Sequence, residues 1–203
     1  MRTSKMENEL NEKYWEAKYQ SKKLGWDIGY VSTPIKDYVD QLTDRDLGVL
    51  IPGAGNSYEA EYLHKNSFKN VDVLDFANIP LEALKQRVPT FNTDHLHHTD
   101  FFSFEGQFDL IIEQTFLSAL APARRQEYVR KMNSLLKPGG RLVGVLFNID
   151  FKNDHPPFGG DLHEYKELFA PYFNIKIMET ALNSIPERNG SEIFINLEKQ
   201  SNI

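Results

Sequence analysis

Cysteine is absent from the 203-residue chain. Without it the protein can form no disulfide, no zinc–thiolate site and no cysteine nucleophile. Basic residues are also few, because 23 Lys and Arg stand against 29 Asp and Glu, giving a net charge of -6. Since nucleic-acid binding needs clustered cations to neutralise phosphates, no nucleic-acid partner is expected.

Long apolar runs are missing as well. The first thirty residues contain no stretch of signal-peptide type, and no later segment approaches the length of a membrane span. We therefore expect no membrane partner, and the cytoplasm is the default location. The length and the apolar fraction of 40% suit one globular domain, residues 1–203, with no linker or internal repeat and no sign of an obligate protein partner.

What the chain does contain is a glycine hinge after an apolar segment. Residues 47–51 are mostly aliphatic and lead into Gly53 and Gly55, which are one residue apart. This pattern is typical of a buried parallel strand whose backbone passes close to a ligand before it enters a helix. Ser57 or Asn56 is expected to cap that helix, which covers residues 58–65.

Further strands and helices alternate along the chain. Strands are predicted at residues 71–75, 95–98, 108–113, 141–148, 173–179 and 192–197. Helices are predicted at residues 4–22, 34–42, 79–86, 122–136 and 161–170, the fourth of them ended by residues 137–140. Strands that alternate with helices indicate a parallel α/β sheet, and the last two strands, expected to pair antiparallel, make that sheet mixed.

Acidic and aromatic residues follow the successive strands. Asp75 ends the second strand, 22 residues after Gly53, near the spacing at which an acid receives ribose hydroxyls. Asp100 and Phe101 follow the third strand and suit a purine, and Glu113 ends the fourth. Taken singly, each acid could be a solvated strand end and each glycine a packing requirement. Because they recur at the edge where ligands bind in open α/β sheets, they predict a nucleoside site.

The group attached to this nucleoside is not expected to be a pyrophosphate. A dinucleotide fingerprint would place a third glycine where this chain has Tyr58, and no Gly-Lys-Ser/Thr tripeptide forms a P-loop. Adenosine joined to a cation fits better, and S-adenosylmethionine is such a molecule. Its sulfonium favours aromatic faces, which gives Trp15, Tyr19 and Trp26 a function besides packing.

Four segments together resemble a known family. They are Trp15-x3-Tyr19-x6-Trp26-Asp27-x-Gly29, residues 49–55, residues 108–111 with their extension to Pro122, and Pro156-Pro157-Phe158. The chain resembles the class I S-adenosylmethionine-dependent methyltransferases, and among them the thiopurine S-methyltransferase-like family with its plant thiol and halide methyltransferases. The likeness covers the chain from about Trp15 to the C-terminus.

The resemblance implies a Rossmann-like α/β sheet of order 3-2-1-4-5-7-6 with strand 7 antiparallel, helices on both faces, and residues 1–45 as a helical lid. It also implies methyl transfer to a small-molecule acceptor. The residues expected to bind S-adenosylmethionine are Trp15, Tyr19, Trp26, Gly53, Gly55, Asn56, Asp75, Phe76, Asp100, Phe101, Glu113 and Gln114. The residues expected to line the acceptor pocket are Trp26, Gln114, Pro157 and Phe158.

The chain departs from the family at two positions. Some members carry an arginine where this chain has Gln114, and a cysteine where it has Ala54. Two other functions stay open: a nicotinamide-dependent oxidoreductase, which would share the Gly53 and Asp75 arrangement but is disfavoured by Tyr58, and a cofactor-binding protein without transferase activity, for which Gln114 leaves room.

No catalytic residue is assigned. A thiol with a pKa of about 8.5 ionises often enough to react, and a halide needs no deprotonation, so a dedicated base is optional. His155 is a weak candidate on the proline loop, and His163 is expected on the surface. His95 and His97 could share one face of a strand, but no third ligand is indicated and no metal is expected.

Overall fold

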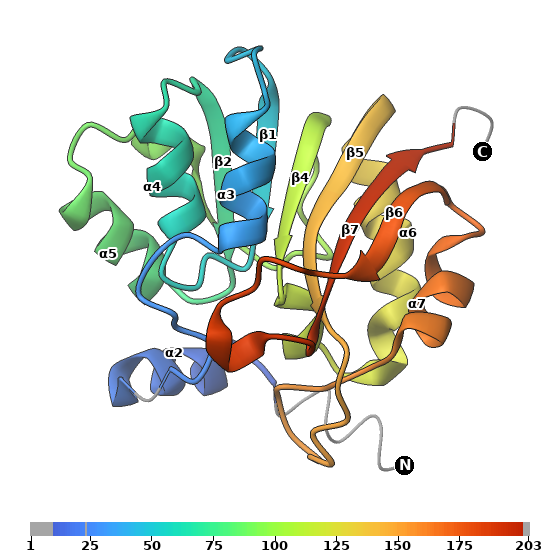
Figure 1. Cartoon of the computed structure of the whole chain (residues 1–203). Coiled ribbons are helices and arrows are strands. Elements are labelled where there is room, and N and C mark those ends of the chain that lie inside the picture. Colours follow the sequence, from blue (N-terminus) through green and yellow to red (C-terminus); the bar gives the residue numbers. More distant parts are fainter. Residues whose placement is uncertain (1–9, 23, 201–203) are drawn as a thin grey trace.

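A seven-stranded sheet forms the centre of the computed structural model, which describes residues 10–22 and 24–200 (Figure 1). The strands are β1 (Gly48–Pro52), β2 (Asn70–Asp75), β3 (Leu96–His98), β4 (Phe108–Gln114), β5 (Leu136–Phe147), β6 (Phe173–Thr180) and β7 (Glu192–Lys199). Their order in the sheet is β3-β2-β1-β4-β5-β7-β6. β7 pairs antiparallel with β5 and β6, whereas β1 to β5 pair in parallel. The predicted strand order and the antiparallel seventh strand are confirmed.

Helices cover both faces of this sheet. They are α2 (Glu12–Ser21), α3 (Thr33–Asp40), α4 (Tyr58–Lys65), α5 (Ile79–Arg87), α6 (Arg125–Leu135) and α7 (Leu162–Phe169). Short 3-10 turns are η1 (Thr93–His95), η2 (Phe116–Ala119), η3 (Pro122–Arg124) and η4 (Pro186–Arg188). Figure 1 shows α3, α4 and α5 on one face, α6 and α7 on the other, and α2 beyond the edge where the parallel strands end. None of the helices in the described residues is long and apolar enough to span a membrane.

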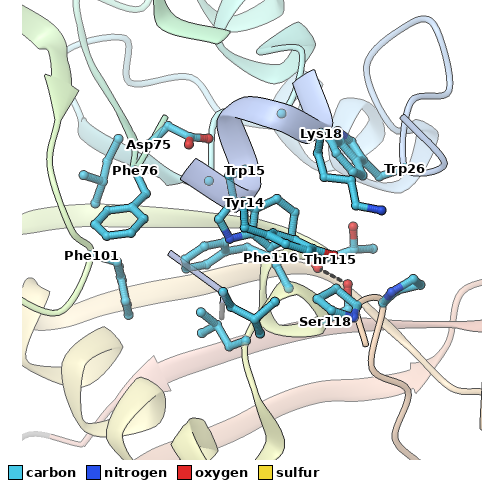
Figure 2. A pocket seen from close by; sticks show the side chains of 18 of the residues that line it. Tyr14, Trp15, Lys18, Trp26, Asp75, Phe76, Phe101, Thr115, Phe116 and Ser118 are labelled. Atoms are coloured by element: carbon cyan, nitrogen blue, oxygen red, sulfur yellow. Dashed lines mark hydrogen bonds between the residues drawn. The ribbon is translucent and has the colours of Figure 1, made fainter. Parts of the chain in front are cut away.

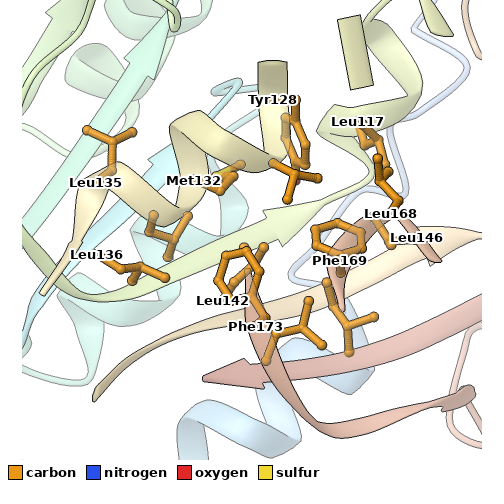
Figure 3. Packing of buried hydrophobic residues seen from close by; sticks show 14 of the residues in the cluster. Leu117, Tyr128, Met132, Leu135, Leu136, Leu142, Leu146, Leu168, Phe169 and Phe173 are labelled. Carbon is orange, nitrogen blue, oxygen red and sulfur yellow. The ribbon is translucent and has the colours of Figure 1, made fainter. Parts of the chain in front are cut away.

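The two helical layers follow from the alternation of side chains along the strands. In β1, Val49 and Ile51 belong to the cluster beneath α3, α4 and α5, whereas Leu50 between them belongs to the opposite cluster. That second cluster, in which Tyr128 and Phe169 reach the sheet from α6 and α7, is shown in Figure 3. Strands buried on both faces are nearly continuous in apolar residues, which is why β1 was recognisable in the sequence.

Several helix ends differ from the prediction. Residues 4–9 of the expected first helix lie outside the described residues, and the described helix α2 begins at Glu12, where Asn11 Oδ1 accepts from the Tyr14 amide at 3.2 Å. Ser57 precedes α4 but does not cap it, because its backbone is left-handed and its hydroxyl donates to the Ala54 carbonyl at 3.2 Å. By contrast, Asp161 caps α7, because its carboxylate accepts from the amides of His163 and Glu164 in the first turn.

The segment of residues 137–140 was assigned wrongly. It was expected to end a helix, but α6 already ends at Leu135 and the segment belongs to β5. Phe108 of β4 pairs with Leu136 of β5, whereas Leu110 pairs with Arg141, so the register shifts between these two pairs. Gly139, inside the shifted segment, has a positive φ of 75°. The segment is thus an irregularity inside β5, enclosed by two pairs with β4, in a sequence that resembles a helix terminator.

Candidate active site

A cavity of about 740 Å³ lies at the carboxyl edge of the sheet. Its walls come from α2, from the turn after β1, from the ends of β2 and β4, and from the proline loop after β5 (Figure 2). Ten of the predicted site residues line it: Trp15, Tyr19, Trp26, Gly53, Gly55, Asp75, Phe76, Asp100, Phe101 and Gln114. Pro157, expected at the acceptor side, also lines it. The volume is within the range of cavities that hold a drug-sized molecule.

The glycine hinge gives the floor of the cavity its shape. Gly53 has a φ of +73°, and its amide donates to the Leu74 carbonyl at 2.8 Å. A Cβ at this position would lie 2.4 Å from Phe116 Cδ2, so no larger residue fits without moving that ring. Gly55, with a φ of +53°, has the indole of Trp26 beside it. The turn therefore needs glycine both for its conformation and for the aromatic rings packed against it.

Asp75 connects three parts of the site. Its carboxylate accepts from the amides of Ala54 and Ala77, both at 2.8 Å, and from the Tyr19 hydroxyl at 3.2 Å. The residue is only 8% exposed, and this burial raises the pKa of its carboxyl to about 6. At neutral pH the carboxylate is therefore mostly ionised, and hydrogen bonds from the hinge and from α2 hold it at the cavity wall.

The aromatic side chains of α2 and of the loop behind it form a continuous group. The ring of Trp26 lies 6.0 Å from Trp15 and 5.6 Å from Tyr19, both edge-on, and Tyr14 lies 5.1 Å from Trp15. Arg188 holds the loop from the other side, where its guanidinium donates to the Trp26 carbonyl at 2.8 Å. Such a cluster offers π faces that favour a cation.

Two buried polar atoms in this cavity have no hydrogen-bond partner among residues 10–22 and 24–200. They are Nε1 of Trp26, a donor, and Oε1 of Gln114, an acceptor. Buried polar groups are nearly always hydrogen-bonded, so unpaired ones at a cavity wall indicate the place of a ligand. The amino-acid end of S-adenosylmethionine carries a carboxylate to accept and an ammonium to donate, which matches these two atoms. The residues present therefore fit this cofactor.

Three predicted site residues do not line the cavity. Glu113 is fully buried, where its carboxylate accepts from the Tyr128 hydroxyl and from the Leu117 amide, and burial raises its pKa to about 7. Phe158 is 5% exposed, and its amide donates to the Ser118 carbonyl at 2.8 Å. The Asn56 carbonyl accepts from Arg87 at 2.6 Å, outside the cavity.

The histidines also lie away from the cavity lining. His155 is exposed with its ring near the Pro156 carbonyl, and exposed His163 lies near Glu167. His95 and His97 both contact Asp72, at 3.1 and 2.6 Å. Among the described residues no group of three His, Cys, Asp or Glu could hold a metal ion.

Several lining residues were missed in the sequence. Lys18 and Tyr14 line the cavity from α2, Phe116 from the turn after β4, and Phe147 from the end of β5. Lys18 could have been found because it lies three residues after Trp15 on the helix, and Tyr14 because it lies four residues before Lys18. The other two carried no local signal.

Comparison with known proteins identifies the family. The family model described as thiopurine S-methyltransferase matches residues 10–200. The chain belongs to the thiopurine S-methyltransferase family. This thiopurine S-methyltransferase family member is 28% identical to the probable thiol methyltransferase 2 of Arabidopsis thaliana over 194 residues, which cover 92% of this chain and 85% of the relative. It is 27% identical to the thiopurine S-methyltransferase of Vibrio parahaemolyticus, covering 80% of this chain and 83% of the relative.

A solved structure supports the fold. The 1,6-didemethyltoxoflavin-N1-methyltransferase of Burkholderia thailandensis, solved with S-adenosylhomocysteine, aligns with a TM-score of 0.68 at 17% identity, covering 92% of this chain and 84% of that one. The fold is therefore that of class I methyltransferases. As a thiopurine S-methyltransferase family member, the protein is an S-adenosylmethionine-dependent methyltransferase and not a nicotinamide-dependent oxidoreductase.

Proposed function

We propose that the protein transfers a methyl group from S-adenosylmethionine to a small soft nucleophile such as a thiol, a thiopurine, a halide or a related chalcogen. The observation that carries this proposal is the division of the cavity into two ends. Asp75, which ends β2, and Asp100, which follows β3, line it together with Phe76 and Phe101, whereas Trp26, Lys18 and Ser118 lie across the cavity from Asp75 and bring no carboxylate to that end (Figure 2). A soft nucleophile needs no acid or base beside it, so it suits that second end.

Asp75 would accept the ribose hydroxyls, because its carboxylate is ionised and fixed by the hinge amides. Phe76 and Phe101 would flank the adenine, with Asp100 near its amino group. The unpaired Nε1 of Trp26 would donate to the carboxylate of the methionine part, and the unpaired Oε1 of Gln114 would accept from its ammonium.

The bound cofactor supplies an activated methyl group on a sulfonium, and the transfer is an in-line displacement at carbon. The residues of this chain would position the acceptor in line with that methyl group and exclude water from it. Trp15, Tyr19 and Trp26 would cover the sulfonium, and Pro157 would border the acceptor. Holding two reactants in an aligned geometry can lower a barrier by several kcal/mol.

The relatives agree with this acceptor class. Their names describe a thiol, a thiocyanate and a thiopurine methyltransferase. Gln114 stands where some family members carry an arginine, which distinguishes this pocket from theirs. A location in the cytoplasm and the absence of an obligate protein partner stay predictions from composition.

The proposal is tested by incubating the full chain with isotopically methyl-labelled S-adenosylmethionine and a panel of thiols, iodide, thiopurines and amines, with products read by mass spectrometry. Labelled thioether or methyl iodide is expected. Transfer to amines alone would overturn the acceptor class. Saturable cofactor binding with no transfer to any member of the panel would favour a binding protein without transferase activity.

A further inference from the structure

The charged side chains around the cavity are unevenly distributed. Among the described residues four of them line it: Lys18, Asp75, Asp100 and Arg124. Asp75 ends β2 and Asp100 follows β3. Arg124 is paired with Glu127 at 2.9 Å, and its guanidinium stacks on a phenylalanine. Figure 2 shows Lys18 on the side of Ser118 and Trp26, across the cavity from Asp75. The acceptor end therefore has a cation of its own.

The charge of Lys18 is not compensated by the helix that carries it. The acids of α2 are engaged elsewhere, since Glu12 pairs with His98 at 3.3 Å and Glu16 accepts from the Asn78 amide at 2.6 Å. In the described part of the chain Lys18 forms no ion pair, and its ammonium lies 5.5 Å from the ring of Tyr14. The side chain is half-buried, so a charge there is less screened than on the open surface.

We propose that Lys18 makes the acceptor end of the cavity an anion site, so that the acceptor is bound and methylated in its anionic form, as a thiolate or a halide. This inference rests on the proposed function. The whole chain has a net charge of -6 and repels small anions, so a local cation is what would draw them into this cavity.

The same cation would favour ionisation of a bound thiol. A neighbouring ammonium stabilises the thiolate over the neutral thiol, and the thiolate is the nucleophile. The thiol proton passes to water before the transfer. The thiolate sulfur then forms the new bond to the methyl carbon as the bond from that carbon to the sulfonium breaks, which leaves a neutral thioether and S-adenosylhomocysteine.

The carboxylate of the cofactor is the other anion that could reach Lys18. Trp26 Nε1, an unpaired donor beside Gly55, is already available to that carboxylate. We therefore assign Lys18 to the acceptor, and the experiments below separate the two sources of negative charge.

Fluorescence quenching tests the anion site without any turnover. The chain has two tryptophans, Trp15 and Trp26, and both line the cavity. Iodide quenching reports the local concentration of anions, whereas acrylamide reports access alone. Lys18→Met should lower the iodide quenching constant at least twofold relative to acrylamide. Lys13→Met, which removes the same charge from an exposed position of α2, should leave the ratio unchanged. The proposal would be overturned if the ratio of the iodide to the acrylamide quenching constant were equal in the wild type, Lys18→Met and Lys13→Met. It would also be overturned if iodide did not quench the wild type.

Kinetics test the consequence for the acceptor. Lys18→Met should raise the KM for iodide on the order of tenfold, the effect of one opposite charge at a partly exposed site. The KM for S-adenosylmethionine should change less than twofold, and methylation of dimethyl selenide, a neutral soft acceptor, should be unaffected. A rise in the cofactor KM instead would assign Lys18 to the cofactor carboxylate. If the wild type methylates nothing, the proposed function fails, while quenching still decides whether Lys18 attracts anions.

Discussion

Replacing Glu113 with glutamine should make the stability of the protein less dependent on pH. The carboxyl is fully buried, and its pKa is raised from 4.5 to about 7 by that burial. Glutamine keeps the shape and the contacts, because its oxygen can accept from the Leu117 amide and its amide group can donate to the Tyr128 hydroxyl. The substitution therefore removes the ionisation without leaving a cavity.

The magnitude follows from the two pKa values. Below pH 4.5 Glu113 is protonated in both states and does not affect the pH dependence. Between pH 4.5 and about pH 7 the unfolded chain loses this proton while the folded protein keeps it, so the unfolding free energy of the wild type falls. Over the whole interval the loss is about 3 kcal/mol, and it is complete above about pH 7. Glu113→Gln does not suffer this loss.

The assay is urea denaturation of the wild type and of Glu113→Gln between pH 4.5 and pH 8. The stability of the variant relative to the wild type should increase by about 3 kcal/mol across that range. Glu105→Gln, at an exposed position, serves as the control and should follow the wild type. Parallel curves for wild type and Glu113→Gln would refute the reasoning, since they would mean that the buried carboxyl ionises as readily as in the unfolded chain.

Three further predictions concern the site. Asp75→Asn should weaken S-adenosylhomocysteine binding about tenfold at pH 7 in calorimetry, and should abolish the rise in wild-type affinity expected as this carboxyl loses its proton near pH 6. Gly53→Ala should lower the unfolding free energy by about 1–3 kcal/mol in urea, because its φ is positive and its Cβ would press on Phe116. Arg188→Met should cost about 3–5 kcal/mol in the same assay, because it leaves the buried carboxylate of Glu192 without its cation.

The two stability predictions have matched controls, and the binding prediction has an outcome that would contradict it. Gly25→Ala, at another glycine of the cavity wall with no atom within 4 Å of the added Cβ, should leave stability nearly unchanged. Adding Glu192→Gln to Arg188→Met should recover part of the loss, and no recovery would contradict the ion-pair explanation. Affinity for S-adenosylhomocysteine that is the same in Asp75→Asn and the wild type would exclude the ribose role of this acid.

Strand and helix positions were largely readable from the sequence. The apolar run before Gly53 marked β1, and the acid that ends residues 71–75 marked the end of β2, because both depend on local composition and period. The strand order came from the family resemblance, since periodicity carries no information about which strands are neighbours. Residues 137–140 were misread because their local preference is that of a helix end, and they belong to β5 only because Leu136 before them and Arg141 after them both pair with β4.

Within the site the sequence by itself determined which residue types follow which strand, and therefore that an acid, a glycine hinge and aromatic residues meet at one edge. Tertiary structure decided which of them face the cavity. Glu113 and Gln114 are adjacent, yet successive side chains on a strand point to opposite faces, so one is buried against Tyr128 and the other lines the cavity. The hydrogen bond from Tyr19 to Asp75 joins positions 56 residues apart. Such contacts arise only when α2 packs over the strand ends, and no local pattern encodes that packing.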